Sequence, residues 1–333
     1  MKLSKNLLNN LIEITSNSAI ACYPHLGKND KISADKAATD LMRRELNMLN
    51  IKGEVVIGEG ELDEAPMLYI GEKLGNGLGQ EIDIAVDPVE GTNFVAKNLP
   101  GAMSVLAVSE KGNLLKAPET YMNKIASGNH VPNGCLDLDY TVEKNLKNYS
   151  EVTNKKLSEI TVCILDRPRH KKIIDELNRL KVNIKYISDG DVSGALLVTD
   201  TKFNVDIYMG IGGGPEGVIA ASALKVLDCN FQARFLFETE HEILRAKQMG
   251  IKDLNKKYDI DDIIKGESIF CATGITSGDL MNGIIKKNNK FITETIVAHD
   301  KAILKLIKKD VSITWLIFKI AIKDLPLVPS SIG

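Results

Sequence analysis

The segment IDIAVDPVEGTN, at residues 82–93, constrains the fold more than any other part of the sequence. Residues 82–86 are mostly apolar and β-branched, which predicts a strand that ends at Asp87-Pro88. The proline fixes its own φ, and Gly91 can adopt backbone conformations that other residues resist. We therefore expect a buried strand that runs directly into a tight bend.

This bend carries three side chains with oxygen atoms. Asp87 ends the strand, Glu90 lies one turn further on, and Thr92 follows Gly91. Oxygen ligands of this kind suit Mg²⁺ or Mn²⁺ rather than zinc. A turn that only caps the following helix is the alternative interpretation.

An acidic segment, GEGELDE at residues 58–64, lies upstream and follows a short strand expected at 54–57. Its four carboxylates repel one another unless they are solvated or neutralised by a cation. By itself the segment is compatible with an acidic surface turn, and beside the bend at 87–92 it is compatible with part of a metal site.

A glycine-rich segment, GIGGGPEG at residues 210–217, precedes a helix expected at 216–227. Exposed amides at the N-terminus of a helix favour anions, phosphate above all. The segment lacks the Gly-Lys-Ser/Thr of a Walker A motif, and Pro215 occupies the last glycine position of the dinucleotide fingerprint. A nucleotide site therefore has little support, whereas a phosphate site and a simple turn both remain open.

Two further polar turns follow expected strands. In DRPRH, at residues 166–170, two arginines flank a proline and could clamp a phosphate, although an exposed basic turn fits equally well. In Asp189-Gly190-Asp191 the carboxylates could accept hydrogen bonds from sugar hydroxyls or cap the next helix. The sequence has neither His-Glu-x-x-His nor Gly-x-Ser-x-Gly, so a zinc protease and a serine hydrolase find no support.

Composition narrows the class of protein. The 333 residues include 42 basic and 44 acidic side chains, and the net charge of −2 gives no general attraction to nucleic acid or to anionic membranes. No apolar run reaches the roughly 18–20 residues of a membrane span, and the N-terminus is too polar for a signal peptide. The five cysteines form no Cys-x-x-Cys pair, which predicts buried or inert thiols in a reducing cytosol.

Strands and helices are expected to alternate along the second half of the chain, which indicates a layered α/β protein with ligand sites after the strands. Strands are predicted at 54–57, 82–86, 103–108, 160–165, 182–187 and 205–209, and helices at the N-terminus, at 34–49, 170–180 and 216–227, and after Asp191. A polar stretch at 129–154 is the candidate junction. We predict an N-terminal metal-binding α/β domain at 1–150 and a C-terminal α/β substrate-binding domain at 151–333.

Taken together, these segments resemble class II fructose-1,6-bisphosphatase, of the lithium-sensitive sugar-phosphatase superfamily. The resemblance runs in order from about residue 14 to about residue 305, and several segments are more similar to the cyanobacterial type, which also cleaves sedoheptulose-1,7-bisphosphate. The resembling segments are VVIGEGELDEAPMLYIGEKLG (55–75), IDIAVDPVEGTN (82–93), PGAMSVLAVSEKG (100–112), APETYMNKIA (117–126), DRPRH (166–170), ISDGD (187–191), YMGIGGGPEGV (208–218) and FCATGITSGDLM (270–281).

The resemblance implies a layered α/β/α/β/α sugar-phosphatase fold. It also implies hydrolysis of the 1-phosphate of fructose 1,6-bisphosphate by a metal-activated water, with Mn²⁺ or Mg²⁺ as cofactor. Through the family it further implies a cytoplasmic enzyme of gluconeogenesis that assembles as a dimer or tetramer. Another sugar or inositol phosphatase is the alternative within this class, and a metal-dependent phosphate-binding module without turnover is the alternative outside it.

The same resemblance assigns roles to residues. The metal ligands carry over to Asp35, Glu59, Asp87, Glu90 and Glu216. Thr92 matches the threonine that helps to activate water, and Asp63 matches a nearby catalytic acid. Substrate contacts carry over to the side chains of Tyr121, Arg167, Arg169, Asp189 and Asp191, and to backbone amides of Gly91, Gly213 and Gly214. A binding module would need neither Thr92 nor Asp63, and the arginine pair implies a second phosphate on the substrate.

The sequence departs from the family at its periphery. Gly27-Lys28-Asn29 stands where family members often have Gly-Arg-Gly, and the loop after Phe235 is shortened. Asp300-Lys301-Ala302 replaces a Ser-x-x-Arg-Thr, and the tail at 308–333 has no recognised counterpart. Differences from the family are therefore expected in subunit contacts and regulation.

Overall fold

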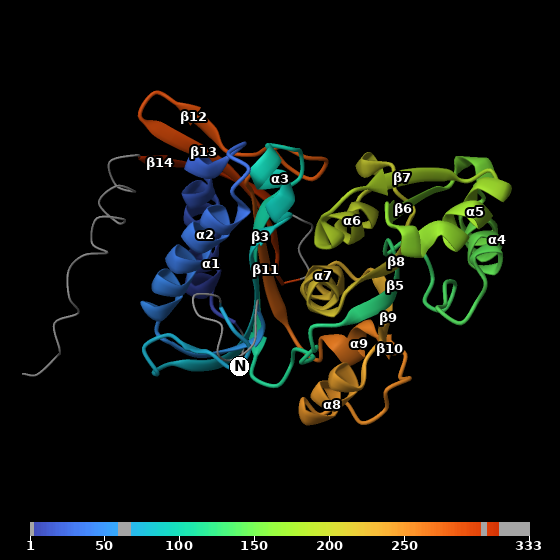
Figure 1. Cartoon of the computed structure of the whole chain (residues 1–333), viewed down its shortest axis with the longest axis horizontal. Coiled ribbons are helices and arrows are strands. Elements are labelled where there is room, and N and C mark those ends of the chain that lie inside the picture. The colour runs from blue at the N-terminus through green and yellow to red at the C-terminus, as the bar shows by residue number, and fades with distance from the viewer. Residues whose placement is uncertain (1–2, 59–67, 301–304, 313–333) are drawn as a thin grey trace, which may run out of the picture.

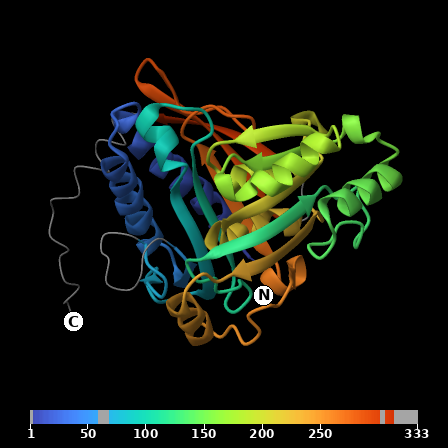
Figure 2. The same cartoon turned by 45° about the vertical axis from the view of Figure 1, so that its right-hand side comes forward.

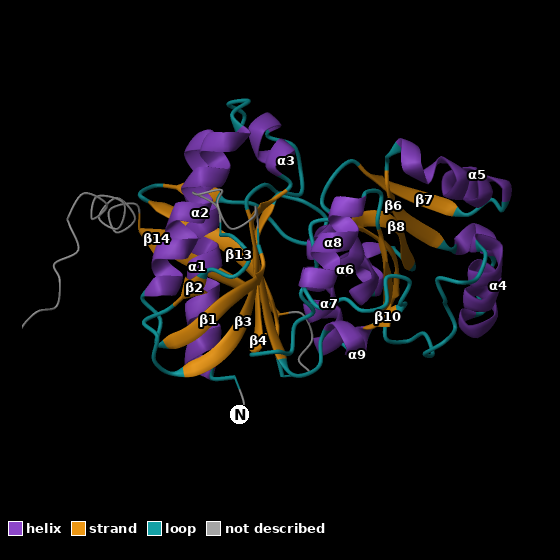
Figure 3. Cartoon of the chain, turned by 60° about the horizontal axis from the view of Figure 1, so that its bottom comes forward, coloured by secondary structure: helices purple, strands orange, loops and turns teal. Residues whose placement is uncertain are grey.

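A computed structural model describes residues 3–58, 68–300 and 305–312 of the chain. Two β-sheets alternate with three groups of helices, so that five layers follow one another across the molecule (Figures 1 and 3). Figure 2 gives the same arrangement from another side, with the blue helices α1 and α2 and the green helices α4 and α5 at opposite ends. The predicted α/β/α/β/α order is confirmed.

The helices occupy the two outer layers and the middle one. α1 and α2 cover the outer face of the first sheet, α6 and α7 lie between the sheets, and α4 and α5 cover the outer face of the second sheet (Figure 1). The bounds are α1 Lys5–Cys22, α2 Lys31–Asn47, α3 Thr92–Lys97, α4 Val142–Thr153, α5 Lys171–Arg179, α6 Asp191–Leu196, α7 Gly214–Val226, α8 Glu240–Gln248 and α9 Ile260–Ile263, with a 3₁₀ turn η3 at Pro168–His170.

The first sheet has the strand order β12-β13-β11-β4-β3-β1-β2, and β14 also pairs with β13. β1 and β3 are parallel, whereas the other neighbouring strands are antiparallel. The bounds are β1 Ile51–Ile57, β2 Lys73–Leu74, β3 Gln80–Glu90, β4 Met103–Glu110, β11 Ser268–Gly274, β12 Ile285–Lys287, β13 Lys290–Ala298 and β14 Lys305–Ser312.

The second sheet has the strand order β10-β9-β5-β8-β6-β7, parallel from β8 through β6 to β7 and antiparallel elsewhere. The bounds are β5 Tyr121–Ser127, β6 Thr161–Leu165, β7 Asn183–Ile187, β8 Ile207–Gly213, β9 Asn230–Leu236 and β10 Tyr258–Asp259. The chain thus enters the second sheet at β5 and returns to the first sheet at β11. The predicted division of roles between 1–150 and 151–333 stays a prediction.

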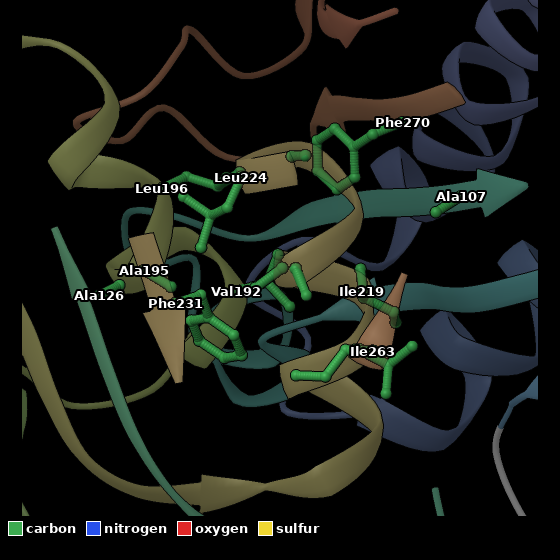
Figure 4. Close-up of a cluster of buried hydrophobic side chains, with 14 of the residues drawn as sticks. Ala107, Ala126, Val192, Ala195, Leu196, Ile219, Leu224, Phe231, Ile263 and Phe270 are labelled. Carbon is green, nitrogen blue, oxygen red and sulfur yellow. The ribbon is translucent and has the colours of Figure 1, made fainter. Parts of the chain in front are cut away.

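Helix α7 is the centre of the molecule because it lies between the two sheets. It is apolar on every side, as a helix with no solvent-facing stripe must be, and Val218, Ile219, Ala221 and Leu224 are buried. Figure 4 shows Ile219 and Leu224 among side chains from both sheets and from α6, including Phe231 and Phe270. Packing around α7 therefore fixes the position of the helix that carries Glu216 in its first turn.

Two strands extend further than the sequence predicts. β3 continues through Asp87-Pro88 to Glu90, because the pairing with β4 slips there and leaves the proline outside the regular ladder. The glycine-rich segment was expected to be a loop, but residues 210–213 form the last part of β8 and pair with β5. Both extensions carry predicted site residues to a strand end.

Two predictions from composition can be compared with the structure. The five cysteines are buried and form no disulfide. In the parts of the chain that the structure describes, no helix combines the length and apolarity needed to cross a membrane.

Candidate active site

The last part of β3 has one extra residue, which builds the bend. Asp87 pairs with Val105 of β4, whereas Glu90, three residues later, pairs with Met103, so β3 has three steps where β4 has two. Gly91 follows in the left-handed region with φ of 81°, where glycine is favoured, and caps the start of α3. Asp87, Glu90 and the first residue of α3 are thereby held on one short segment, as predicted.

Glu90 joins this bend to the other half of the molecule. Its side chain is buried, and its Oε1 accepts a hydrogen bond of 2.9 Å from the backbone N–H of Val192 in α6. Burial raises the pKa of Glu90, and the neighbouring Asp87 and Glu216 raise it further. These three carboxylates come from β3 and α7, yet they lie close enough to disfavour one another's charge.

Glu216 approaches the same place from the first turn of α7. Burial raises its pKa, partly offset by the positive charge of Lys124. Its Oε2 is buried without a hydrogen-bond partner in the described part of the chain. An unsatisfied carboxylate oxygen among other carboxylates is a donor set that suits a hard divalent cation.

The glycines of β8 make room for these side chains. A Cβ at Gly212 would overlap the carboxylate of Asp191, and a Cβ at Gly213 would overlap that of Glu216. The amide of Gly214 already donates a 2.7 Å hydrogen bond to the carbonyl oxygen of Thr120. Gly214 could therefore lend its amide to a phosphate only by giving up this bond.

A buried lysine that the sequence analysis missed completes this side of the site. Lys124 of β5 is 2% exposed, and its ammonium group forms an ion pair with Asp191, which is 8% exposed. The same Nζ donates a 2.5 Å hydrogen bond to the carbonyl oxygen of Gly213. The signal in the sequence was its alternation with Met122 and Ala126, which places a charge on the buried face of a strand.

The predicted phosphate clamp lies across the ends of β5, β6 and β8. The guanidinium carbon of Arg169 lies 4.7 Å from the ring centre of Tyr121, and its Nε donates a 3.0 Å hydrogen bond to the carbonyl oxygen of Ile211. Arg167 is 4.0 Å from the carboxylate of Asp189. Tyr121 is paired with Gly213 across the sheet. The clamp, formed by Tyr121 and the two arginines, is therefore a neighbour of the acidic cluster, formed by Asp87, Glu90 and Glu216.

A cavity of about 460 Å³ opens between these groups. Its walls include Asp87 from the bend, Glu216 from α7 and Tyr121 from the clamp, together with Glu119 and Glu242. The same cavity is therefore lined by two members of the acidic cluster, Asp87 and Glu216, and by one member of the clamp, Tyr121. Because its lining includes these four carboxylates, an anionic ligand would need bound cations to enter it.

The remaining predicted metal and catalytic residues lie on other segments. Asp35 lies in α2, which packs on α3 and β3. Glu59 and Asp63 lie outside the described residues. Among the described residues, no three acidic, histidine or cysteine side chains are arranged as a finished metal site.

Comparisons with known proteins identify the family of the chain. Residues 5–310 match the family described as "Bacterial fructose-1,6-bisphosphatase, glpX-encoded". The chain is 42% identical over 317 residues to "Fructose-1,6-bisphosphatase class 2" of Haemophilus influenzae, covering 91% of this chain and 94% of that protein. It is 44% identical over 303 residues to "Fructose-1,6-bisphosphatase 1 class 2" of Escherichia coli, covering 87% and 90%.

A cyanobacterial relative has a broader name. The chain is 40% identical over 312 residues to "D-fructose 1,6-bisphosphatase class 2/sedoheptulose 1,7-bisphosphatase" of Trichodesmium erythraeum, covering 86% of this chain and 90% of that protein. Among solved structures, "Thermotoga maritima IMPase" matches 60% of this chain and 79% of its own at 15% identity and a TM-score of 0.34, too low to support a statement about fold or function. By its sequence, the chain belongs to the class 2, glpX-type family of bacterial fructose-1,6-bisphosphatases.

Proposed function

We propose that this chain hydrolyses the 1-phosphate of fructose 1,6-bisphosphate, giving fructose 6-phosphate and inorganic phosphate. The observation that carries the proposal is the cavity lined by Asp87, Glu216 and Tyr121, with the guanidinium group of Arg169 lying over the Tyr121 ring. An acidic cluster that needs cations would hold the reacting phosphate, and the arginine would hold the distal one. The names of the family relatives supply the substrate class.

The metal site would use Asp87, Glu90 and Glu216, with Asp35 and Glu59 as the further ligands that the family resemblance implies. The donor set suits the group, since buried carboxylates with raised pKa values and one unsatisfied oxygen favour a hard cation. Mg²⁺ or Mn²⁺ bound there would supply positive charge for the phosphate oxygens and lower the pKa of a bound water. Which of the two ions the enzyme prefers is a matter for metal titration.

The remaining steps belong to side chains of the chain itself. The hydroxyl of Thr92, at the start of α3, would orient the attacking water, and Asp63 would take up its proton. Arg167 and Arg169, with Tyr121, would bind the distal phosphate, and Asp189 and Asp191 would accept hydrogen bonds from sugar hydroxyls. Binding energy from the distal phosphate would be used to position the reacting one.

Activity on sedoheptulose 1,7-bisphosphate is the second candidate function. It is favoured by the name of the Trichodesmium erythraeum relative, which matches this chain about as well as the single-function relatives do. The two substrates share the reacting and distal phosphates and differ in the length of the sugar between them. The cavity must therefore accept one more carbon for this activity to occur.

We further infer a cytoplasmic enzyme of gluconeogenesis that works as a dimer or tetramer. Five buried thiols without a disulfide suit a reducing compartment. The oligomeric state rests on the family resemblance, and size-exclusion chromatography with light scattering would measure it.

A phosphate-release assay tests the proposed function. The protein is stripped of metal with a chelator and assayed with fructose 1,6-bisphosphate, sedoheptulose 1,7-bisphosphate, fructose 1-phosphate and inositol 1-phosphate, before and after Mn²⁺ or Mg²⁺ is restored. We expect metal-dependent release that is fastest from a bisphosphate. Equal rates from inositol 1-phosphate would favour the alternative phosphatase, and no release from any substrate would favour a binding module.

A further inference from the structure

His170 follows the two arginines directly in the sequence, and its side chain is completely buried. It is the last residue of η3, and its Nδ1 lies 2.6 Å from the carbonyl oxygen of Leu165 at the end of β6. Its Nε2 lies 2.7 Å from the backbone nitrogen of Ile211 in β8. Because the amide of Ile211 can only donate, Nε2 accepts, and the proton of a neutral ring is on Nδ1, where it donates to Leu165.

The ring is therefore a neutral bridge between two strand ends. Burial lowers the pKa of His170, and the positive charge of Arg169 lowers it further. The backbone hydrogen bonds and the negative charge of Asp191 oppose this shift without cancelling it. A protonated ring would have to give up the hydrogen bond from Ile211, since Nε2 would then be a donor.

A glycine in β8 leaves space for the imidazole ring of His170. Gly210 has φ of 138°, and a Cβ at this position would lie only 3.0 Å from Nε2 of His170. Any other residue would be strained there and would also press against the imidazole. Glycine at position 210 thus permits a close approach of the ring to the strand.

Arg169 binds the other backbone group of the same residue, Ile211. The N–H of Ile211 donates to His170, and the carbonyl oxygen of Ile211 accepts from Nε of Arg169 at 3.0 Å. The guanidinium group then lies over the ring of Tyr121. The position of the arginine head therefore depends on where the backbone at Ile211 is held.

We propose that His170 is a positioning residue for the distal-phosphate site, which fixes Arg169 against β8 before the substrate arrives. Because the ring is completely buried, it would act only through the backbone of Ile211 and through η3. This inference rests on the proposed function, because it takes Arg169 as the ligand of the distal phosphate. It predicts that loss of the ring weakens recognition of the distal phosphate more than it slows the chemical step.

The test compares kcat/KM for fructose 1,6-bisphosphate with kcat/KM for fructose 1-phosphate, which lacks the distal phosphate. His170→Leu removes both hydrogen bonds, and we expect KM for the bisphosphate to rise about 10-fold, the usual effect of losing one or two neutral hydrogen bonds. The constants for fructose 1-phosphate should change less than about 2-fold, which is within ordinary scatter of a remote substitution. His170→Gln retains an acceptor within reach of Ile211, so it should recover part of the preference for the bisphosphate over fructose 1-phosphate. It also serves as the second variant if His170→Leu does not fold.

Two further variants make the outcome decisive. His130→Leu removes a histidine whose Nε2 is hydrogen-bonded to Tyr149, away from the clamp, and should leave the preference unchanged. In an Arg169→Ala background, His170→Gln should have no further effect on the preference, because the group that it positions is gone.

The results separate this inference from the function on which it rests. The inference is wrong, and the proposed function stands, if Arg169→Ala reduces the preference for the bisphosphate over fructose 1-phosphate and the His170 variants do not. The same conclusion follows if the His170 variants lower kcat/KM equally for both substrates. If Arg169→Ala itself leaves the preference unchanged, the distal-phosphate assignment is wrong and the inference falls with it. The positioning role is supported if substitutions at Arg169 and at His170 each lower the ratio of kcat/KM for the bisphosphate to kcat/KM for fructose 1-phosphate, and if the two effects do not add.

Discussion

Lys124 and Asp191 form a buried ion pair that connects β5 to the first turn of α6. The same ammonium group also donates to the carbonyl oxygen of Gly213 at the start of α7. One lysine thus links three elements that carry predicted site residues. It also places a fixed positive charge beside Glu216, where it opposes the effect of burial on that carboxyl group.

Lys124→Met should destabilise the protein strongly. The substitution removes one partner of a buried pair and leaves the carboxylate of Asp191 uncompensated, which costs about 3–5 kcal/mol of unfolding free energy. Urea unfolding measures the loss. Lys172→Met, at an exposed position of α5, is the matched control and should cost less than about 0.5 kcal/mol.

The double variant Lys124→Met/Asp191→Asn identifies the cause. If the loss reflects an unpaired buried charge, neutralising Asp191 should recover part of it, and the double variant should be more stable than Lys124→Met alone. If the losses of unfolding free energy in Lys124→Met and Asp191→Asn simply add, the lysine contributes packing and not charge compensation.

Glu90→Gln should separate apo stability from metal binding. Without cations the buried charge of Glu90 is disfavoured, as its raised pKa indicates, so the chelated variant should be at least as stable as the chelated parent. Addition of Mn²⁺ at about 100 times its dissociation constant should stabilise the parent by about 2.7 kcal/mol, and this gain should largely vanish in the variant. Thermal melts with and without metal measure both effects, and an equal gain in parent and variant would remove Glu90 from the ligand set.

Thr92→Ala should lower kcat by roughly 10²–10⁴-fold, the range expected for loss of a general-base contribution. KM and metal affinity should change little, because a neutral hydroxyl adds little to cation binding beside several carboxylates. Gly91, not Thr92, is the N-cap of α3, and within the described part of the chain no side-chain hydrogen bond caps this helix. A variant with near-parental kcat and a lowered Tm would instead assign Thr92 to the stability of the bend.

Glu54 should contribute stability that disappears in acid. Its carboxylate accepts hydrogen bonds from Lys73 at 2.6 Å and from Lys116 at 2.9 Å, which lower its pKa from 4.5 to about 2. The folded state therefore binds this proton less readily than the unfolded state does, so the contribution is present above pH 4.5 and is lost as the pH falls toward 2.

The experiment compares parent and Glu54→Gln by urea unfolding across this range. The difference in unfolding free energy should be largest above pH 4.5 and should shrink as the pH approaches 2. Glu151→Gln, at an exposed position, should show no such trend. A difference that is independent of pH would mean that the substitution acts through packing.

The sequence predicts a layered α/β protein because strands and helices alternate in the second half of the chain, whereas the order of the five layers comes from the family resemblance. The segment at 82–93 also predicts its bend correctly, since Pro88 and Gly91 restrict the backbone locally. What the sequence could not predict is how β5 and β11 divide the chain between two sheets, because strand pairing depends on contacts far apart in the sequence.

The glycines at 210–214 illustrate the same limit within the site. As a sequence they fit a phosphate site or a simple turn, but in the structure Gly210, Gly212 and Gly213 leave space for His170, Asp191 and Glu216 respectively. A glycine needed for a close approach and a glycine needed for a turn look identical in a sequence. Lys124 was missed because no strand was predicted at 121–127, and a lysine is usually an exposed residue.

Hydrolysis of fructose 1,6-bisphosphate in ¹⁸O-enriched water, followed by ³¹P NMR, tests the central claim most directly. The metal-loaded enzyme should release inorganic phosphate that carries one ¹⁸O atom from water, and the remaining sugar should be fructose 6-phosphate with an unlabelled phosphate group. This result would show attack of water on phosphorus at the 1-position, with the distal phosphate retained. Fructose 1-phosphate as the product, inorganic phosphate without ¹⁸O, or no turnover with either Mn²⁺ or Mg²⁺ would contradict the account.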